Sequence, residues 1–535
     1  MRGSSTLFVF CLLFYSFVTK AQNHQQRLEN IDVQHYRFQI SLNDDNNQIS
    51  GKTEILVKFL QASGDIQFDL DAYNSSTGKG MKVEKVFARN KKLEFIQSGE
   101  QLIIKTGEEM QPGDSISFTI EYSGIPADGL IIDQNRYGNR TFFGDNWPNR
   151  AHYWLPTVDH PSDKATLEFL VNAPDHYKVV SNGYLVEETE LANQQKFTHW
   201  KEDVPISTKI MVIGAADFAI GNDTVWNGIP VNAWVFKENR EKGFENYSYE
   251  TKALEYFSEL IGPYSYEKLS HVQSKTRYGG MENATCIFYN ENSAVSNKSQ
   301  ESLFAHEVAH QWFGNSATEE NWHHVWLSEG FATYLTHVYN QHFYGEDLFR
   351  EGLKKDRQQV IAFYHRHPAP IIDTTVTEYI KLLNANSYQK AGWFLHMLRH
   401  QLGDDVFFAG VKKYYATYQN ATALTSDFRK IMEEVSGEDL KNFFDQWLLQ
   451  PGYPLLNWSW TQTSDKTLTI NIKQTQKQAL FIFPLEILLH YKNGEESVVQ
   501  LTISNQTTTK TIRLPNLIKN IDLDPGVKLL FEETK

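Results

Sequence analysis

The sequence predicts a multidomain protein of the α+β class, and three observations support this. The chain has 535 residues, too many for one hydrophobic core, which favours two to four domains. Apolar and polar residues alternate over residues 30–215, as in half-buried antiparallel strands. The spacing becomes helical near residue 240, and alternation returns after Pro451-Gly452.

The N-terminal strands are clearest in two runs, residues 36–42 and 116–122, where apolar side chains occupy every second position. Turn-forming clusters at residues 43–46 and 112–114 separate such runs. We therefore expect an N-terminal β domain over residues 22–218.

The middle of the chain is expected to be mainly helical. Residues 247–261 place apolar side chains at three- and four-residue spacings, and residues 299–450 continue with few strand signals. We therefore expect a mainly helical domain over residues 219–450. The final segment, residues 451–535, has the size and turn spacing of a small β-sandwich.

Residues 1–21 are predicted to be a cleaved signal peptide. Arg2 supplies a positive start, an apolar run covers residues 7–18, and small residues precede a cleavage point after Ala21. The run is too short to span a bilayer, and no later stretch reaches that length. We expect a secreted or periplasmic protein with no transmembrane segment after cleavage; an uncleaved N-terminal anchor is the alternative.

The charge of the chain argues against nucleic acid as a partner. The formal net charge is −14, and removing residues 1–21 takes away two basic and no acidic residues, which gives −16. A surface of this sign repels phosphate backbones and anionic membranes.

The segment His306-Glu307-Val308-Ala309-His310 matches the pattern H-E-x-x-H, which on a helix places two imidazoles on one face. A catalytic zinc takes three protein ligands and leaves one position for water. Glu329 is the expected third ligand, because the 18 residues after His310 allow a second helix to pack alongside the first. His323 and His324 are rival ligands in a stretch that has the pattern of a loop.

Two histidines and one carboxylate favour a single Zn²⁺ over the harder cations, which prefer oxygen ligands. Glu307, next to the first ligand, is then free to take a proton from the attacking water. The sequence therefore predicts zinc-dependent hydrolysis. The alternative is a pair of surface histidines on a helix with no metal.

Further motifs accompany this site, and together they resemble a known family. The motifs are Gly279-Gly280-Met281-Glu282-Asn283, Gly262-Pro263-Tyr264-Ser265-Tyr266, the segments 326–332 and 156–161, and Gln446-Trp447. With the spacing of the metal site, they resemble the zinc aminopeptidases that include aminopeptidase N and leukotriene hydrolase, which are gluzincin metallopeptidases. The resemblance covers nearly all of the chain after residue 21.

The resemblance implies three domains: a β-rich N-terminal saddle, a thermolysin-like catalytic domain and a small β-sandwich. The large C-terminal helical domain of many members is expected to be missing, because the sequence stops after the sandwich. We therefore expect a more open active site than in those members.

The resemblance also assigns residues that bind substrate. Gly279, Gly280, Met281, Glu282 and Asn283 form the exopeptidase motif, in which the carboxylate of Glu282 pairs with the free α-amine. The two glycines let backbone approach backbone, as strand-like docking of a peptide requires. From the residues alone, the glycines would be an ordinary turn and Glu282 an exposed acid.

Tyr388 matches the family tyrosine that stabilises the oxyanion of the tetrahedral intermediate. The family usually has glycine directly after the following lysine, whereas this chain has Ala391 and then Gly392. The alternative for Tyr388 is a core tyrosine on a helix.

A second departure concerns the N-terminal domain. Family members usually place Gln or Glu there as a further amine-binding group, followed by Ala-Arg. That position is Trp147 here, and His152 stands where arginine is expected. Either Asp145 substitutes from two residues away, or Glu282 binds the amine alone.

Together these features predict a zinc aminopeptidase that removes N-terminal residues from peptides with a free N-terminus. An endopeptidase or epoxide hydrolase on the same scaffold is the nearest alternative. A non-catalytic peptide-binding protein is the alternative from a different class, and the intact set of ligands and base argues against it.

Overall fold

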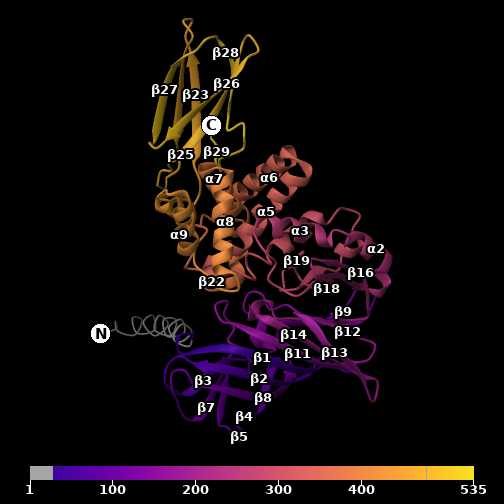
Figure 1. The fold of residues 1–535 in the computed structure, drawn as a ribbon. Helices are drawn as coiled ribbons and strands as arrows, with labels where there is room; N and C mark the ends of the chain where they lie inside the picture. The colour runs from indigo at the N-terminus through magenta and orange to yellow at the C-terminus, as the bar shows by residue number, and fades with distance from the viewer. Residues whose placement is uncertain (1–27, 478, 535) are drawn as a thin grey trace, which may run out of the picture. The chain divides into compact units, whose positions relative to one another are not determined.

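The computed structural model describes residues 28–477 and 479–534, and the predicted signal peptide, residues 1–21, lies outside the described residues. The chain divides into two compact units. The first runs to Thr251 and includes Ser265–Gln300, and the second consists of Lys252–Tyr264 and Glu301–Lys535. Sheets dominate the first unit, and helices followed by a C-terminal strand layer make up the second (Figure 1). The predicted α+β class is confirmed.

The largest layer of the first unit is an eight-stranded sheet in which β1 lies between an antiparallel neighbour and a parallel one. Its strands, in spatial order, are β13 (Tyr184–Leu191), β14 (Gln195–Ser207), β11 (Lys164–Pro174), β1 (Ile31–Ser41), β2 (Ile49–Phe59), β8 (Ser115–Ile125), β4 (Gly80–Ala88) and β5 (Lys91–Lys92). The predicted alternation is visible in β1, where Tyr36, Phe38 and Ile40 are fully buried and Gln39 is exposed. One face of this sheet therefore builds the N-terminal core.

Three smaller sheets complete the first unit. One contains β12 (Lys178–Ser181), β15 (Ile213–Ala216), β10 (Arg140–Gly144) and β9 (Leu130–Gln134); a second contains β3 (Ser63–Asp69), β7 (Gln101–Met110) and β6 (Phe95–Ser98); the third contains β16 (Phe218–Trp226), β17 (Ile229–Phe236), β18 (Leu269–Ser274), β20 (Cys286–Asn290) and β19 (Gly280–Met281). In the third sheet β19 is an edge strand, and it carries part of the predicted exopeptidase motif.

The helix predicted over residues 247–261 is present but starts later than predicted. A short helix, α2 (Arg240–Asn246), ends before it, and α3 (Glu250–Leu260) begins three residues later than expected. The reason is local: the side-chain amide of Asn246 donates to the carbonyl of Ala294 at 3.0 Å, and the hydroxyl of Tyr247 lies 2.7 Å from that of Ser293. These contacts hold the chain in a turn.

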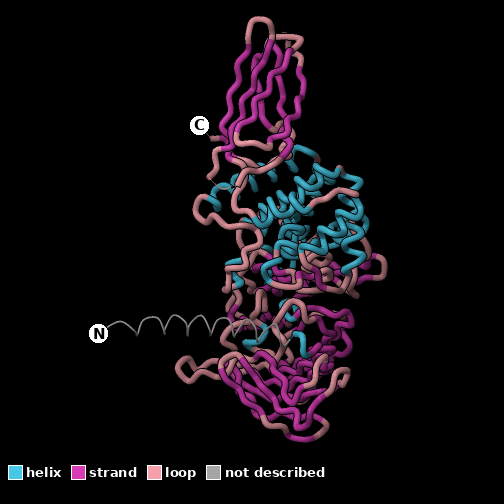
Figure 2. Tube along the Cα trace, turned by 90° about the vertical axis from the view of Figure 1, so that its left-hand side faces the viewer, coloured by secondary structure: helices cyan, strands magenta, loops and turns pink. Residues whose placement is uncertain are grey.

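Helices make up most of the second unit before residue 450, as the sequence predicts (Figure 2, cyan). After α3 they are α4 (Glu301–Ala309), α5 (Trp326–Tyr344), α6 (Glu346–Tyr364), α7 (Ala391–Leu402), α8 (Asp404–Tyr418), α9 (Thr425–Ser436) and α10 (Lys441–Phe444). Two-residue strands β21 (Thr318–Glu319) and β22 (Thr422–Ala423) pair in parallel. Two π-helical turns interrupt the series, at Asn386–Lys390 and Asp445–Leu449.

Two sheets form the C-terminal part of the second unit. One contains β27 (Thr507–Arg513), β24 (Thr467–Gln474), β23 (Leu455–Gln462) and β29 (Glu532–Glu533), and the other contains β26 (Glu496–Ile503), β25 (Phe483–Tyr491) and β28 (Ile518–Leu523). Leu468, Ile470 and Ile472 of β24 are fully buried, as their alternation predicts. Arg357 of α6 joins this part to the helices through an ion pair with Asp524 at 2.6 Å.

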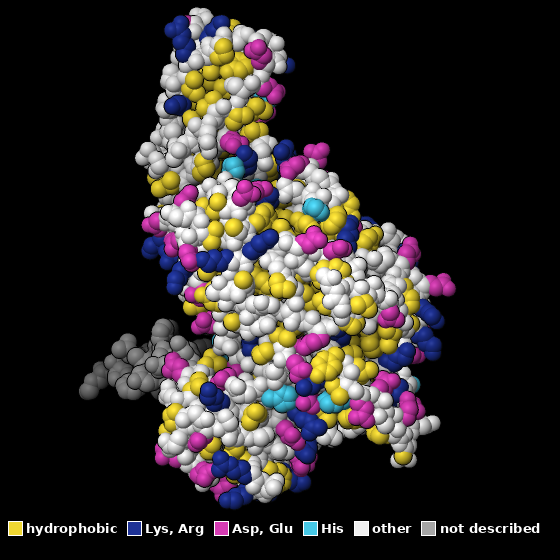
Figure 3. All heavy atoms as spheres, in the orientation of Figure 1, with side chains coloured by type: hydrophobic (Ala, Val, Ile, Leu, Met, Phe, Trp, Pro, Cys, Tyr) yellow, Lys and Arg dark blue, Asp and Glu magenta, His cyan; other side chains and the backbone are white. Residues whose placement is uncertain are grey.

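Within the described part of the chain, no helix combines the length and the apolar character needed to cross a bilayer. Acidic and basic side chains are intermixed over the face drawn in Figure 3.

Candidate metal centre

The two histidines of the H-E-x-x-H segment lie at the C-terminal end of α4. His306 is in its last turn, and His310 follows directly after Ala309, still one helical turn further on, with its amide 3.3 Å from the carbonyl of His306. The start of α4 is held by Glu301, whose carboxylate accepts from Lys252 and Tyr339 at 2.6 Å each. Both imidazoles therefore project from a helix that is anchored at its other end.

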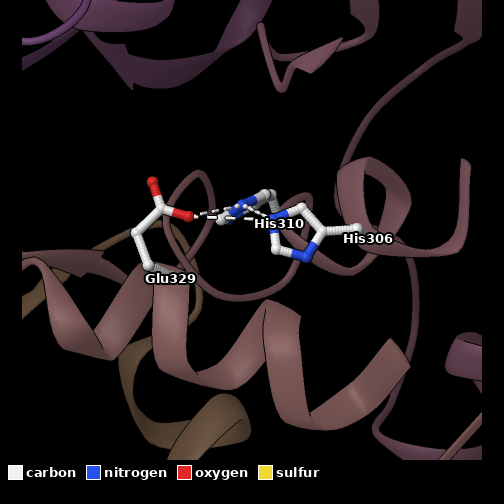
Figure 4. Close-up of side chains that lie close together, drawn as sticks. All are labelled: His306, His310 and Glu329. Carbon is white, nitrogen blue, oxygen red and sulfur yellow. Dashed lines mark hydrogen bonds and ion pairs between the residues drawn. The ribbon is translucent and has the colours of Figure 1, made fainter. Parts of the chain in front are cut away.

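Glu329 comes from α5, where it lies in the first turn. Figure 4 shows its carboxylate pointing toward the two imidazoles. One carboxylate oxygen, Oε2, lies 3.2 Å from Nε2 of His310 and 3.7 Å from Nε2 of His306, and the two Nε2 atoms are 3.2 Å apart. The structure therefore brings the three predicted ligands together.

These separations fit a single zinc ion. Ligand bonds of about 2.0–2.1 Å in a tetrahedral site place donor atoms about 3.3 Å from one another. The three donor atoms also form a group that could hold a metal, and His310 and Glu329 are buried whereas His306 is partly exposed. Three protein ligands are the number that a catalytic zinc site takes.

The second nitrogen of His310 fixes its tautomer. Nδ1 lies 3.2 Å from the carbonyl of Phe313 and 3.0 Å from the hydroxyl of Ser328. A carbonyl only accepts, so Nδ1 carries the proton and Nε2 presents its lone pair to the cluster. Gly314 is required beside this contact, because a side-chain carbon there would lie 2.2 Å from the Ser328 hydroxyl.

The carboxylate of Glu329 is kept ionised by its neighbours. Burial alone would raise its pKa, but the imidazoles of His310 and His306 hold the pKa well below the usual range. The ionised carboxylate is the form that ligates a metal ion.

The rival histidines are occupied elsewhere. His323 and His324 form a short 3₁₀ turn, Trp322–His324. Nε2 of His323 lies 3.0 Å from the carbonyl of Val376, and Nδ1 of His324 lies 2.7 Å from the hydroxyl of Thr425.

Glu307 and Tyr388 lie in the same unit as the cluster. Glu307 is buried and directly follows His306 on α4. The ring of Tyr388 is stacked nearly parallel to that of His306, with ring centroids 6.2 Å apart. Tyr388 therefore lies against the metal cluster, instead of deep in a core helix.

Tyr388 sits on the π-helical turn Asn386–Lys390, directly before α7. The side chain of Asn386 holds this turn by donating to the carbonyls of Ala369 and Pro370 at 3.1 and 3.2 Å. Lys390 is fully buried, its ammonium is 3.3 Å from the carbonyl of Gln450, and burial lowers its pKa to about 7. Single π-turns of this kind are frequent at functional sites.

The departure at Ala391 has a structural explanation. Gly330, next to Glu329 on α5, packs against Ala391 so closely that a side-chain carbon at Gly330 would lie 2.5 Å from the Ala391 methyl group. The methyl group of Ala391 fills the space that the missing side chain of Gly330 leaves.

The predicted exopeptidase motif, Gly279–Asn283, lies in the first unit. Gly280 and Met281 form β19, which pairs antiparallel with β20. Glu282 follows this strand and is 4% exposed, so it is a buried carboxylate where the residues alone suggest an exposed acid. Gly279 ends a bend, where its carbonyl accepts from the amide of Asn290 at 3.0 Å, and Gly280 begins β19.

Asp145 is already paired. It is fully buried, and its carboxylate lies 2.8 Å from Nη2 of Arg150 and 3.7 Å from Nε of Arg277. His152, in the place of the expected arginine, forms an ion pair with Asp159 at 2.7 Å. Burial alone would lower the pKa of His152, but Asp159 raises it above its ordinary value.

Sequence reasoning missed the residues that support the site. Ser328 could have been found, because it directly precedes Glu329 in the matching segment 326–332. The pairing of Asp145 with Arg150 and Arg277 could not, because Arg277 is far from Asp145 in the chain and no sequence pattern shows that both arginines meet one carboxylate.

Comparison with known families gives two matches. The Peptidase M1 N-terminal domain matches residues 32–210, and the Peptidase family M1 domain matches residues 246–447. Together they cover well over half of the chain.

Individual relatives of the chain are aminopeptidases. The chain is 26% identical to glutamyl aminopeptidase of Sus scrofa over 466 residues, which covers 82% of this chain and 48% of that protein. It is 30% identical to aminopeptidase M1 of Arabidopsis thaliana over 391 residues, covering 68% of this chain and 44% of that protein. The chain therefore spans about half the length of the curated relatives it matches.

Two solved structures share the fold. Aminopeptidase A of Legionella pneumophila, in complex with aspartic acid, aligns with a TM-score of 0.80 at 17% identity over 95% of this chain and 60% of that one. A mutant M1 zinc metallopeptidase of Deinococcus radiodurans aligns with a TM-score of 0.67 at 23% identity, over 79% of this chain and 96% of that one.

Proposed function

Because the chain belongs to the peptidase M1 family, we propose that it is a zinc-dependent aminopeptidase that removes N-terminal residues from peptides. The observation that carries the proposal is the cluster of His306, His310 and Glu329, whose donor atoms have the separations of ligands around one ion. The relatives named above are aminopeptidases, which supports the same activity.

In this proposal His306, His310 and Glu329 hold one zinc ion. Bound zinc supplies Lewis acidity, which polarises a peptide carbonyl and lowers the pKa of water. Glu307 takes a proton from the attacking water and later returns it to the departing amine. The Tyr388 hydroxyl donates a hydrogen bond to the oxyanion that forms on the carbonyl carbon.

Glu282 binds the free α-amine of the substrate as an ion pair. Its burial supports this task, because a carboxylate removed from water discriminates strongly between an ammonium partner and a blocked, neutral N-terminus. The pairing of Asp145 with two arginines supports Glu282 as the sole carboxylate for the amine. The edge position of β19, with Gly280 and Met281, is suited to a substrate that adds as a strand.

In this proposal the protein is exported, and residues 1–21 are removed as a signal peptide. The remaining chain has a β domain at 22–218, a catalytic domain at 219–450 and a β-sandwich at 451–535. The signal-like pattern of the first 21 residues supports export. The change from helices to strands between Leu449 and Leu455 supports the limit at residue 450.

Hydrolysis of a panel of aminoacyl chromogenic amides, each with and without an N-acetyl block, tests the activity. We expect cleavage of the free-amine forms only, lost on chelation and restored by zinc. Equal cleavage of acetylated substrates would contradict the role of Glu282 and favour an endopeptidase. No cleavage of any substrate by the zinc-loaded protein would contradict the proposed peptidase activity.

A further inference from the structure

The short connection that contains Glu282 has an unusual backbone. Residues 282–285 join β19 to β20, and Thr285 at the end of this connection has φ of +62°. A β-branched residue seldom adopts this left-handed conformation, and such residues persist only where the surroundings hold them. Thr285 is fully buried. Its neighbours therefore show what holds it.

Three groups hold Thr285 and the residue before it. The amide of Gly183 donates to the hydroxyl of Thr285 at 2.8 Å. The ammonium of Lys268 donates to the carbonyl of Thr285 at 3.0 Å and to its hydroxyl at 3.2 Å. The side-chain amide of Asn182 donates to the carbonyl of Ala284 at 2.6 Å. We call Asn182, Gly183, Lys268 and Thr285 the clasp.

The clasp is itself fixed. Asn182 also donates to the carbonyl of Ile210 at 2.8 Å and accepts from the amide of Val212 at 2.8 Å, so its amide cannot turn. Gly183 has φ of +72°, and a side-chain carbon there would lie 1.8 Å from the carbonyl oxygen of Lys201. Only glycine fits this position.

Lys268 ties the two sides of the clasp together. Its ammonium donates to the carbonyl of Ser181 at 2.7 Å as well as to Thr285, and it lies 4.9 Å from the centre of the Trp200 ring. The side chain is buried, and burial lowers its pKa. A buried lysine is costly, and here its donors are spent on two backbone carbonyls and one hydroxyl.

We propose that Asn182, Lys268 and Thr285 are positioning residues for the amine-binding carboxylate, an inference that rests on the proposed role of Glu282. Pairing with β20 fixes the chain at Met281, and the clasp fixes it at Ala284 and Thr285. Glu282 is held between these two anchors. A carboxylate presented in one orientation binds an ammonium more tightly, because little side-chain and loop freedom is lost on binding.

Two hydroxamates separate amine binding from metal binding. Leucine hydroxamate carries a free α-amine, and isocaproyl hydroxamate has the same side chain and metal-binding group without the amine. The ratio of their inhibition constants reports the amine contact alone. The variants are Thr285→Val, which keeps the shape but removes the hydroxyl acceptor, and Lys268→Met, which removes the ammonium. Thr285→Ser keeps the hydroxyl and serves as the matched control.

We expect the wild-type enzyme to prefer leucine hydroxamate by at least about tenfold. In Thr285→Val and Lys268→Met this preference should fall to about threefold or less, while inhibition by isocaproyl hydroxamate changes by less than about twofold. Thr285→Ser should retain the wild-type preference. A structural defect alone would weaken both inhibitors together, which the unchanged isocaproyl value excludes.

The inference is overturned if both variants keep the wild-type preference, or if they lose affinity for both inhibitors equally. The two inhibition constants of the wild-type enzyme test the proposed role of Glu282 separately. Equal inhibition of the wild-type enzyme by the two compounds would remove the amine-binding role of Glu282, and the inference with it. If neither compound inhibits the wild-type enzyme, the proposed metal centre is contradicted.

Discussion

Three glutamates have different proposed tasks, and their surroundings differ accordingly. Glu329 faces two imidazole nitrogens, which keep it ionised as a metal ligand should be. Glu282 is buried on the connection after β19, where an ammonium is its proposed partner. Glu307 is adjacent in sequence to a ligand, which suits proton transfer at the same centre without coordination. At this scale, the environment of each carboxylate decides its task.

The clearest prediction for a single residue concerns Glu307. Glu307→Gln keeps the size of the side chain but removes its ability to accept a proton. We expect kcat to fall by about 10²–10⁴, the usual contribution of a positioned general base. Zinc content should stay at one ion per chain, measured by atomic absorption beside steady-state kinetics.

Glu320→Gln is the matched control, because Glu320 is an exposed glutamate that directly follows β21. It should retain wild-type kcat. Near-normal turnover in Glu307→Gln would show that another group acts as the base.

The residues of the metal centre could be predicted because the spacing of these residue types along the chain is typical of a zinc site. The spacing of His306, His310 and Glu329 specified a cluster that the structure does assemble. The state of Asp145 could not be predicted, because its charge is balanced by Arg150 and Arg277, and such pairing depends on the folded chain. The roles of all these residues in catalysis stay predictions.

At the scale of elements, the contact between α5 and α7 sets the geometry of the site. Glu329 is on α5, Tyr388 lies directly before α7, and Gly330 meets Ala391 where the two helices touch. The sequence predicted the helices but not the π-helical turn that carries Tyr388, because its conformation depends on tertiary contacts such as those of Asn386.

Gly330→Ala tests this contact. The added methyl group would lie 2.5 Å from that of Ala391, so the helices must separate. We expect a loss of about 1–3 kcal/mol in the free energy of unfolding, as for other overpacked cores. Activity should fall as well, because Glu329 and Tyr388 move with the helices. Denaturant unfolding and kcat/KM measure the two effects.

The double variant Gly330→Ala with Ala391→Gly is the control, since it returns the space that the first change fills. We expect it to be more stable than Gly330→Ala alone. Simple addition of the two single effects would show that the two positions do not contact each other as described.

His396 joins α7 to the C-terminal sheets. Its Nε2 lies 3.0 Å from the carbonyl of Val527, and its Nδ1 lies 3.2 Å from the hydroxyl of Tyr334. Burial lowers the pKa of His396 from 6.5 to about 3. The folded protein therefore holds this imidazole neutral under conditions in which the unfolded chain protonates it.

The burial of His396 predicts that the folded protein loses stability in acid. Between pH 6.5 and about 3 the unfolded chain binds a proton that the folded chain excludes, so stability falls as pH falls through this window. The contribution of His396 is fully present above pH 6.5, and its loss is on the order of 2–4 kcal/mol. His396→Gln cannot be protonated, so its melting temperature should decline less than that of the wild type between pH 6.5 and 4.

His367→Gln, at an exposed histidine after α6, should keep the wild-type pH dependence. Parallel declines in the wild type and His396→Gln would place the acid-sensitive group elsewhere.

At the scale of the whole molecule, the fold class followed from periodicity, and its topology did not. Alternation in residues 36–42 predicted a half-buried strand, and β1 is one. Nothing in that alternation predicted that Phe38 of β1 pairs in parallel with Phe169 of β11. The domain limits at residues 218 and 450 stay predictions.

Titration of the metal-free enzyme with zinc tests the proposed metal centre. Hydrolysis of a free-amine substrate is followed as zinc is added to a known concentration of chelator-treated protein. We expect activity to rise linearly and to stop rising at one zinc ion per chain. Full activity without zinc, or zinc binding at one ion per chain with no activity at any substrate concentration, would contradict it.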